Sequence, residues 1–548
     1  MSSPQKPWSM TRVVTASSAG TAFEWYDFFI FGSLTPVIAK VFLARLEPTA
    51  ALIAALALFA VGFAFRPLGA IIFGAMGDRV GRKATFLTTV SLMGGATFAI
   101  GLLPTYAQAG IIAPILLVFL RICQGTALGG EYGGAAIYVA EHADNDHRGA
   151  ATGWIQSSAS IGLLAALGVI VATRTALGTE AFNAWGWRIP FLASAILLII
   201  SLWMRLKLSE SPTFAKLRDE GATSKAPLRE AFTTRANLKQ VLIAFFAIMC
   251  AQGAVWYFTF FYMQVFLEKS LGMPAATKDL MLILMTIVSA PLYVFFGALS
   301  DRVGRKPVML GGMLLALALY FPGSHWIASA VNPALVQAQE QRPVVLEADP
   351  ATCSSQFDPT GTAKFTSACD IAKSALISRG ISYTMAPARG ANVDVVYVLV
   401  GPVDAAPIES GEGRPDLKAH KTAMAKLLNS VLEANGYPTS ADPAAIDYPI
   451  LLLVLLGFTI AATAVYGPQA AALVEMFPTR IRYTAMSLPY HVGTGWVGGF
   501  LPVTSFAIVA LTGDIYAGLW YAVGFTALSA VVTILFLKET RGKPLEEC

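Results

Sequence analysis

Two carboxylates lie inside an apolar segment that is long enough to cross a membrane. Glu24 and Asp27 belong to the stretch GTAFEWYDFFIFG, residues 20–32. At 1.5 Å per residue they would lie roughly 17–21 Å along the first span, close to its middle. An ionisable group at that depth costs about 2.5–3.5 kcal/mol, so it usually faces a cavity or a charged partner. We therefore expect these carboxylates to titrate.

Three further charges are expected inside the spans of the first half of the chain, namely Arg66, Arg121 and Glu131. Three acids against two bases leave one unbalanced negative charge, which the binding of one proton removes. The spans of the second half carry no such charge away from their ends, only His491. A proton pathway is therefore predicted in the first half.

Asp27 is the leading candidate for the proton carrier, and Arg121 for its partner. Ionised Asp27 would hold Arg121 by a charge-assisted hydrogen bond, and protonation would release Arg121 to an anionic ligand. Glu131 is a competing carrier, and Glu24 belongs to the same proton-coupling group. The alternative is a static ion-pair network that only orders the helices.

A ligand-binding set is predicted around the same charges. Arg66 and Arg121 suit bidentate recognition of a carboxylate. Gln124 and Tyr132 share a helix face with Arg121, and aromatic faces can also hold a quaternary ammonium group. His491 can change its charge near neutral pH, or serve as a neutral packing residue. Further aromatic residues are expected to face Arg121 together with His491, namely Trp25, Tyr26, Trp256, Tyr257 and Tyr490. Their alternative role is ordinary packing or an interfacial belt.

The elements that position these residues are membrane helices. Of 548 residues, 55% are hydrophobic and 13% charged, against about a quarter charged in soluble proteins. The chain is predicted to be an all-α polytopic membrane protein, and its start, MSSPQKPWSM, does not resemble a removable signal peptide. Twelve spans are expected near 13–39, 52–76, 84–103, 111–140, 150–173, 189–206, 238–267, 279–299, 307–322, 448–474, 483–511 and 515–537.

Basic residues gather in the loops that follow even-numbered spans, which predicts that both termini lie in the cytoplasm. The net charge of +5 does not indicate a nucleic-acid partner. GDRVGRK lacks the spacing of a phosphate-binding loop, and neither zinc-ligand spacing nor a nucleophile–His–acid set stands out. We therefore expect no metal, no cofactor and no enzymatic activity.

Two motifs occur twice. GDRVGRK (77–83) pairs with SDRVGRK (300–306), and EHADNDHR (141–148) pairs with EMFPTRIR (475–482). Asp78 and Asp301 are 223 residues apart, whereas Glu141 and Glu475 are 334 apart, so the second half holds 111 extra residues. Two six-helix halves are the economical interpretation. In both copies Asp78 and Asp301 could pair with cations or cap the next helix. The gating residues predicted from these motifs are Asp78, Arg79, Arg82, Lys83, Glu141, Arg148, Asp301, Arg302, Arg305, Lys306, Glu475, Arg480 and Arg482.

The extra residues form a predicted insert at 325–446, between helices 9 and 10 and outside the cytoplasm. RPVVLEA and DVVYVLVGPV predict strands, and DLKAHKTAMAKLLNSVLEANG an amphipathic helix, so we expect a small α+β module. Cys353 and Cys369 could pair in an oxidising compartment or stay free. The predicted divisions are a first half (1–207), an interdomain loop (208–237), a second half (238–324 and 447–548) and the insert.

With its repeated GDRVGRK loops, the chain resembles the major facilitator superfamily. EWYDFFIFG, FRPLGAIIFGAMGDRVGRK, RICQGTALGGEYGGAAIYVAEHA and EMFPTRIRYTAMSLPY are similar to the bacterial metabolite:H⁺ symporters, which carry proline and betaine, α-ketoglutarate, shikimate and citrate. Sugar porters of the superfamily have a similar acid and arginine on helices 1 and 4. The insert and His491, where the family pattern suggests Asn, depart from that resemblance.

The resemblance implies a monomer in the inner membrane of a bacterium that imports a small organic acid or zwitterion with protons, by alternate opening of its two halves. Two alternatives stay open. The same coupled cycle can run as proton antiport that exports a metabolite or drug. A nutrient sensor is the other, with the insert as its ligand-binding part.

Overall fold

The computed structural model describes residues 10–43, 58, 61–207, 210–354, 365–389, 394–401 and 404–545. The predicted span 52–76 lies partly outside them. Ten of the described helices are long and apolar enough to cross a membrane. The helix with the two carboxylates and the one that begins at Arg66 occupy the two remaining predicted positions. The prediction of a helical membrane protein with a small α+β insert is confirmed.

The first half consists of long helices joined by short connections. Its helices are α1 (Met10–Ser33), α2 (Thr35–Phe42), α4 (Arg66–Arg79), α5 (Arg82–Leu102), α6 (Tyr106–Ala109), α7 (Ile112–His142), α8 (Arg148–Leu177), α9 (Thr179–Ala181) and α10 (Arg188–Leu206). Two short helices, α11 (Pro212–Asp219) and α12 (Pro227–Thr233), connect it to the second half.

The second half begins with one long helix, Arg235–Ser270, in which π-helical turns separate the α-helical parts. Such turns are frequent at functional sites. Its helices are α13 (Arg235–Ile243), α14 (Cys250–Tyr257), α15 (Met263–Val265), α16 (Ala275–Val303), α17 (Arg305–Val331), α21 (Tyr448–Tyr466), α22 (Gln469–Met476), α23 (Arg482–Val492), α24 (Leu501–Thr512) and α25 (Leu519–Phe536).

The ninth span is longer than predicted. The sequence predicted 307–322, whereas α17 continues past Pro322 to Val331. Its last turns stay helical because Ile327, Ala328 and Val331 are buried. The insert therefore begins at α18 (Pro333–Gln341) rather than at residue 325.

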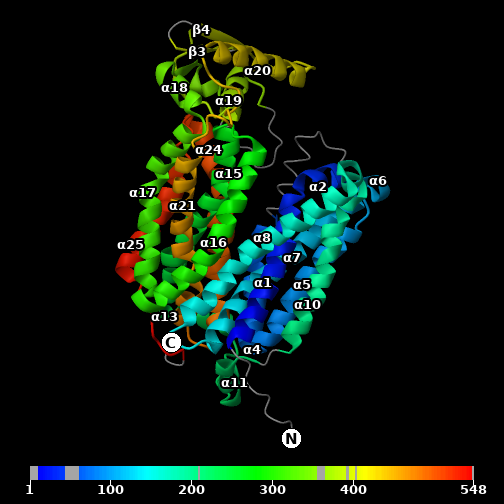
Figure 1. The fold of residues 1–548 in the computed structure, drawn as a ribbon, viewed down its shortest axis with the longest axis vertical. Helices are drawn as coiled ribbons and strands as arrows, with labels where there is room; N and C mark the ends of the chain where they lie inside the picture. The colour runs from blue at the N-terminus through cyan, green and yellow to red at the C-terminus, as the bar shows by residue number, and fades with distance from the viewer. Residues whose placement is uncertain are drawn as a thin grey trace.

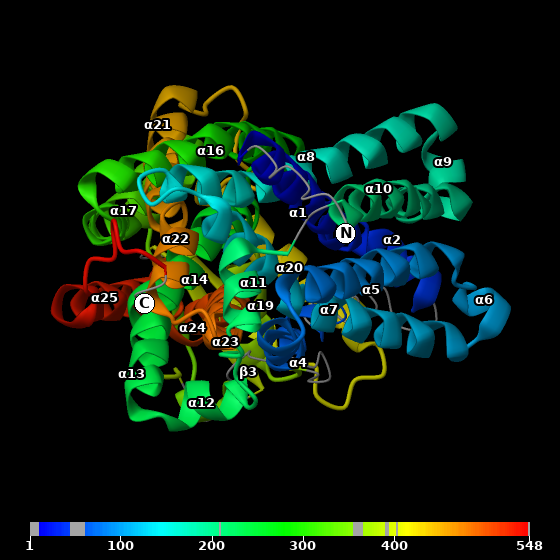
Figure 2. The ribbon, with the colours of Figure 1, turned by 90° about the horizontal axis from the view of Figure 1, so that it is seen from below.

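The two halves lie side by side (Figures 1 and 2). Helix α8 of the first half packs along α16 of the second, and α4 packs along α23. The first pair touches backbone to backbone, because a Cβ atom on Gly149 would lie only 2.4 Å from the carbonyl oxygen of Gly297. Small residues of this kind let membrane helices approach closely.

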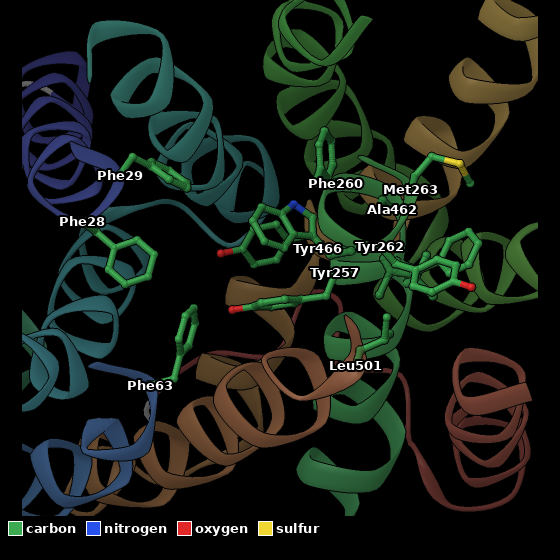
Figure 3. Close-up of a cluster of buried hydrophobic side chains, with 14 of the residues drawn as sticks. Phe28, Phe29, Phe63, Tyr257, Phe260, Tyr262, Met263, Ala462, Tyr466 and Leu501 are labelled. Carbon is green, nitrogen blue, oxygen red and sulfur yellow. The ribbon is translucent and has the colours of Figure 1, made fainter. Parts of the chain in front are cut away.

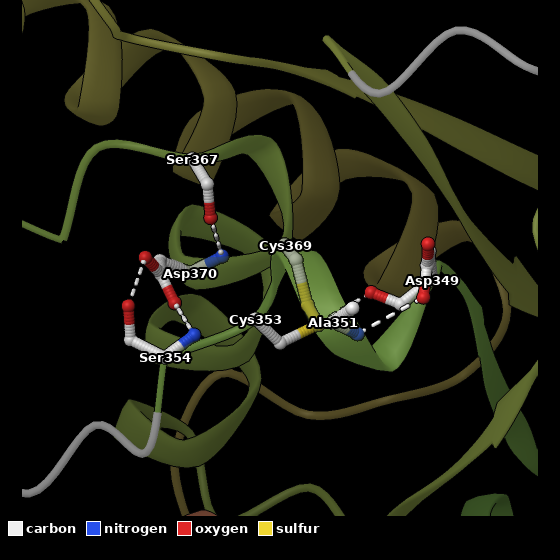
Figure 4. Close-up of a disulfide and its surroundings, with 7 residues drawn as sticks. All are labelled: Asp349, Ala351, Cys353, Ser354, Ser367, Cys369 and Asp370. Carbon is white, nitrogen blue, oxygen red and sulfur yellow. Dashed lines mark hydrogen bonds between the residues drawn. A yellow bond between two sulfur atoms is a disulfide. The ribbon is translucent and has the colours of Figure 1, made fainter.

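After α18, the insert consists of β1 (Val344–Glu347), α19 (Ala368–Ser378), β2 (Tyr383–Ala386), β3 (Val395–Val400), β4 (Asp404–Glu409) and α20 (Leu417–Ala434). The four strands form one sheet with the order β2-β1-β3-β4, in which β1 is parallel to β2 and antiparallel to β3. A disulfide joins Cys353 to Cys369, at the start of α19 (Figure 4).

The insert rests on the second half, at the end of the molecule opposite to the start of α1 (Figure 1). The backbone N–H of Tyr383 donates to the carbonyl of Gly513 at 2.8 Å. The Asn332 amide donates to the carbonyl of Leu271 at 3.0 Å, and the N–H of Ala441 to that of Gly272. These bonds fix the module to the loops of one half.

Candidate functional site

A small cavity lies between the two halves. Three of the five charges predicted inside the spans line it, namely Glu24, Arg66 and Glu131. Its lining residues are Thr21, Glu24 and Trp25 of α1, Arg66 of α4, Leu128, Glu131 and Tyr132 of α7, and Tyr490 and His491 of α23. The cavity is therefore walled by both halves.

Arg205, near the end of α10, is a buried cation that the sequence prediction missed. Its guanidinium donates to Glu24 and, at 3.3 Å, to Glu131, and it lies over the ring of Phe86. Arg205 is 1% exposed. The predicted excess of one negative charge is therefore wrong, because three acids face three bases.

Asp27 and Arg121 do not form the predicted ion pair. Arg121 donates to the amide oxygen of Gln124 at 2.9 Å, and Gln124 donates to the Thr97 hydroxyl at 2.7 Å. The Thr97 side chain in turn contacts the Asp27 carboxylate. A chain of polar side chains thus connects Arg121 to Asp27. Among the described residues, Asp27 forms no ion pair.

Gln124 was predicted to bind ligand, but both of its polar atoms are used inside this chain. Neither Gln124 nor Arg121 lines the cavity. Both are fully buried on α7. Their hydrogen bonds connect α7 to neighbouring helices of the first half, and neither side chain faces the cavity between the halves.

Arg66 is buried in the cavity wall against aromatic rings. Its guanidinium carbon lies 4.9 Å from the centre of the Phe28 ring and 4.5 Å from that of Phe63. Phe63 meets Tyr257 of the second half edge to face, with 6.2 Å between the ring centres (Figure 3). Phe28, Phe63 and Tyr257 form an aromatic layer that joins the two halves on the side of the insert.

The other predicted aromatic residues fall into two groups. Tyr132 and Tyr490 stack across the halves at 3.7 Å, and Tyr490 also meets the hydroxyl of Tyr466, which the prediction did not include. Tyr26 points away from the cavity and donates to the carbonyl of Pro190. Trp256 donates to the hydroxyl of Tyr293 within the second half and lies outside the cavity wall.

The repeated motifs build two ion-pair clusters at the end of the molecule opposite to the insert. In the first cluster, Arg82 bonds Asp78 at 2.6 Å and Arg482 bonds Glu141 at 2.7 Å. In the second, Arg305 bonds Asp301 at 2.6 Å and Arg148 bonds Glu475 at 2.9 Å. All eight side chains are buried.

The two glutamates form ion pairs that cross between the halves. Glu141 does not pair with Arg148 of its own motif but with Arg482, and Glu475 pairs with Arg148. The C-terminal segment adds to both clusters, because the Lys543 carbonyl accepts from Arg148 and the Leu545 carbonyl from Arg482. Together these bonds hold that end of the molecule shut.

Each motif aspartate caps a helix of the opposite half rather than the next helix. Asp78 accepts from the backbone N–H groups of Tyr483 and Thr484 at the start of α23. Asp301 accepts in the same way from Gly149 and Ala150 at the start of α8. These N–H groups have no partner inside their own helix, and the positive helix end favours a carboxylate.

Glu210 and Glu539 take the capping role that was predicted for the aspartates, and the prediction missed them. Glu210 accepts from the N–H of Arg82, and Glu539 from the N–H groups of Arg305 and Lys306. Each follows the last helix of its half, in LKLSE and FLKET. That duplication is a signal in the sequence that could have revealed them.

The remaining predicted gating residues are peripheral. Arg79 and Arg302 are exposed and form no ion pair among the described residues. Lys83 and Lys306 donate to the carbonyls of Leu206 and Ile534, each within its own half. Arg480 is 55% exposed and pairs with Glu230 in the connecting segment.

Comparisons with known proteins agree with this architecture. The profile of the Major Facilitator Superfamily matches residues 17–336, and that of the family described as Sugar (and other) transporter matches 436–548. A putative metabolite transport protein of Haemophilus influenzae is 37% identical over 541 residues, which cover 98% of this chain and 96% of that protein.

A proline/betaine transporter of Salmonella typhimurium is 36% identical over 333 residues. That match covers 59% of this chain and 66% of the transporter, just under two thirds of its length. Among solved structures, the proton:xylose symporter XylE with bound 6-bromo-6-deoxy-D-glucose has a TM-score of 0.64 at 17% identity and covers 98% of both chains. The last likeness is one of fold alone.

Proposed function

We propose that this chain, which belongs to the major facilitator superfamily and is a transporter rather than an enzyme, imports a small organic acid or zwitterion together with protons. The observation that carries the proposal is Asp27. This carboxylate is 5% exposed on α1, forms no ion pair among the described residues, and is connected through Thr97 and Gln124 to Arg121. A buried acid without a cation binds a proton readily.

The two ion-pair clusters supply the second part of the mechanism. They hold one end of the molecule shut, so opening at that end must separate Glu141 from Arg482 and Glu475 from Arg148. We place this end at the cytoplasm because basic residues favour that side. Protonation of Asp27 and occupation of the cavity would together favour the rearrangement that exposes the cavity to the other side.

Purified protein in liposomes with an internal pH dye tests this function. Dicarboxylates, tricarboxylates, shikimate-like acids, proline and betaines are added one at a time to wild type and to Asp27→Asn. Asp514→Asn is the matched control, because Asp514 is exposed on a loop near the insert. We expect one compound to acidify wild-type and control liposomes but not those with D27N.

Each other outcome changes the proposal. Acidification that survives Asp27→Asn would transfer the proton-carrying role to Glu131 or His491. Binding of several compounds without any proton movement would contradict symport and favour a sensor. Alkalinisation on addition of substrate would indicate antiport.

A further inference from the structure

We infer that the cavity between the halves binds a small zwitterion, with its carboxylate at Arg66 and its cationic nitrogen at Glu24 and Glu131. This inference rests on the proposed transport function and names the substrate class of the same site. It depends on two sets of buried polar atoms that face one cavity and have opposite charge.

Arg66 is the positive pole. It is 2% exposed. Among the described residues, its Nε and Nη2 atoms have no hydrogen-bond partner, and the side chain forms no ion pair. Aromatic rings rather than an acid hold it in place. His491 lies in the same wall, 1% exposed, with both ring nitrogens unpartnered in the described structure. The Arg66 side chain also contacts the Tyr257 side chain, which carries no charge to balance it. A buried guanidinium without an acid is costly, and a ligand carboxylate could accept from both Nε and Nη2.

Glu24 and Glu131 are the negative pole. The Oε1 atom of each accepts a hydrogen bond from the shared cation Arg205. The second oxygen of each, Oε2, has no hydrogen-bond partner among the described residues, although both side chains are at least 95% buried. Both residues line the cavity with Arg66. Two carboxylate oxygens are therefore free to accept from, or attract, a cationic group.

The charge balance of the wall selects the class of ligand. Glu24 and Glu131 are balanced by Arg205 and Arg66, so a zwitterion leaves the cavity neutral. A dicarboxylate would bring two negative charges next to Glu24 and Glu131, where Arg66 is the wall cation without an acid among the described residues. Like charges repel strongly in a buried site of low dielectric constant.

The rest of the lining also suits a cationic nitrogen. Trp25, Tyr132 and Tyr490 belong to the wall, and Tyr132 and Tyr490 stack with 3.7 Å between ring centres. Aromatic faces attract alkylated ammonium groups that cannot donate hydrogen bonds. Both an amino acid with a secondary amine and a fully methylated betaine fit this chemistry.

A ligand series that changes only charge tests the inference by calorimetry on the purified full chain in nanodiscs. The probes are proline and glycine betaine (zwitterions), prolinamide (a cation), N-acetylproline (an anion) and succinate (a dianion). We expect at least one zwitterion to bind at least tenfold more tightly than every other probe. Tighter binding of succinate or N-acetylproline than of both zwitterions would overturn the inference.

Two variants then assign the poles. Arg66→Gln should weaken zwitterion binding at least tenfold, and Glu131→Gln should raise the affinity for N-acetylproline relative to proline. Glu412→Gln, at an exposed site of the insert, should change neither. Failure here is distinguishable from failure of the proposed function. A zwitterion that binds but moves no protons keeps the inference, and succinate-driven acidification keeps symport but not the inference.

Discussion

At the scale of single residues, the position of each cation determines what the acids can do. Glu24 and Glu131 share Arg205, whereas the Asp27 carboxylate is reached by Arg121 only through Thr97 and Gln124. A proton on Asp27 therefore breaks no ion pair of the described structure. That difference is the reason to propose Asp27, rather than Glu24 or Glu131, as the proton carrier.

Replacing Arg205 by Met is expected to destabilise the folded protein by about 3–5 kcal/mol, because two buried carboxylates lose their shared cation. The thermal midpoint of the purified protein in detergent measures this effect. Arg218→Met is the matched control: its side chain is 57% exposed and pairs only with the exposed Asp219, so its effect should stay within ~0.5 kcal/mol. Adding Glu24→Gln to R205M should recover part of the loss. An unchanged midpoint for R205M would contradict the shared-cation account.

The sequence predicted the cavity residues better than their pairing. A charge or a histidine inside an apolar span is a strong signal for a functional site. The predicted residues that line the cavity include Glu24, Arg66, Glu131, Tyr132, Tyr490 and His491. Arg205 escaped because it lies in the last turn of its span, next to Lys207, where a basic residue normally points to the interface. Its long side chain reaches back to the cavity instead. Which charged side chains form ion pairs depends on the directions that the side chains take. The spacing of residues along one helix does not determine those directions.

At the scale of elements, the α8–α16 crossing depends on glycine. A Cβ on Gly149 would lie 2.4 Å from the Gly297 oxygen and 2.5 Å from Arg305. Gly149→Ala should therefore separate the halves at the clusters and expose nearby buried positions. We expect a cysteine placed at the buried Thr152 to react with a maleimide at least tenfold faster than in the parent, with Cys123, Cys250 and Cys548 replaced by Ser.

The matched control is Gly95→Ala, because a Cβ there meets no atom within 4 Å. It should leave the reaction rate at Thr152→Cys within twofold of the parent. If both alanine variants gave the same rate, close backbone contact at Gly149 would not be what holds the halves together.

The helices themselves were predictable, but their contacts were not. Long apolar runs locate spans because a membrane leaves few alternatives, and the strands and helix of the insert follow from their own patterns. That Asp78 caps α23, 405 residues away, could not be inferred from the sequence. The prediction gave the aspartates either a cation as partner, which Arg82 and Arg305 provide, or the cap of the next helix. It considered only the next helix because only local neighbours are visible in one chain.

At the scale of the whole molecule, the two halves close one end with the same chemistry used twice. Each motif glutamate bonds the arginine that belongs to the other half's motif, and each motif aspartate caps a helix of the other half. Because every one of these bonds crosses the boundary, none survives if the halves move apart at that end. The closed state is therefore stabilised cooperatively, and loss of a single member should shift the balance.

Glu475→Gln should shift the population toward molecules open at the clusters, since Glu475 is the shared partner of Arg148 and Arg305. Spin labels on cysteines at the exposed Arg79 and Arg302, one on each half, report the distance between the halves at this end. Electron–electron double resonance should show a population with a longer distance between the labels, and this population should grow when Glu141→Gln is added. Glu230→Gln, which breaks only the pair with exposed Arg480, should leave the distribution unchanged because such surface pairs contribute little. If neither cluster substitution changed the distribution of distances between the spin labels, helix packing alone would hold this end shut. The ion pairs would then form in the closed state without stabilising it.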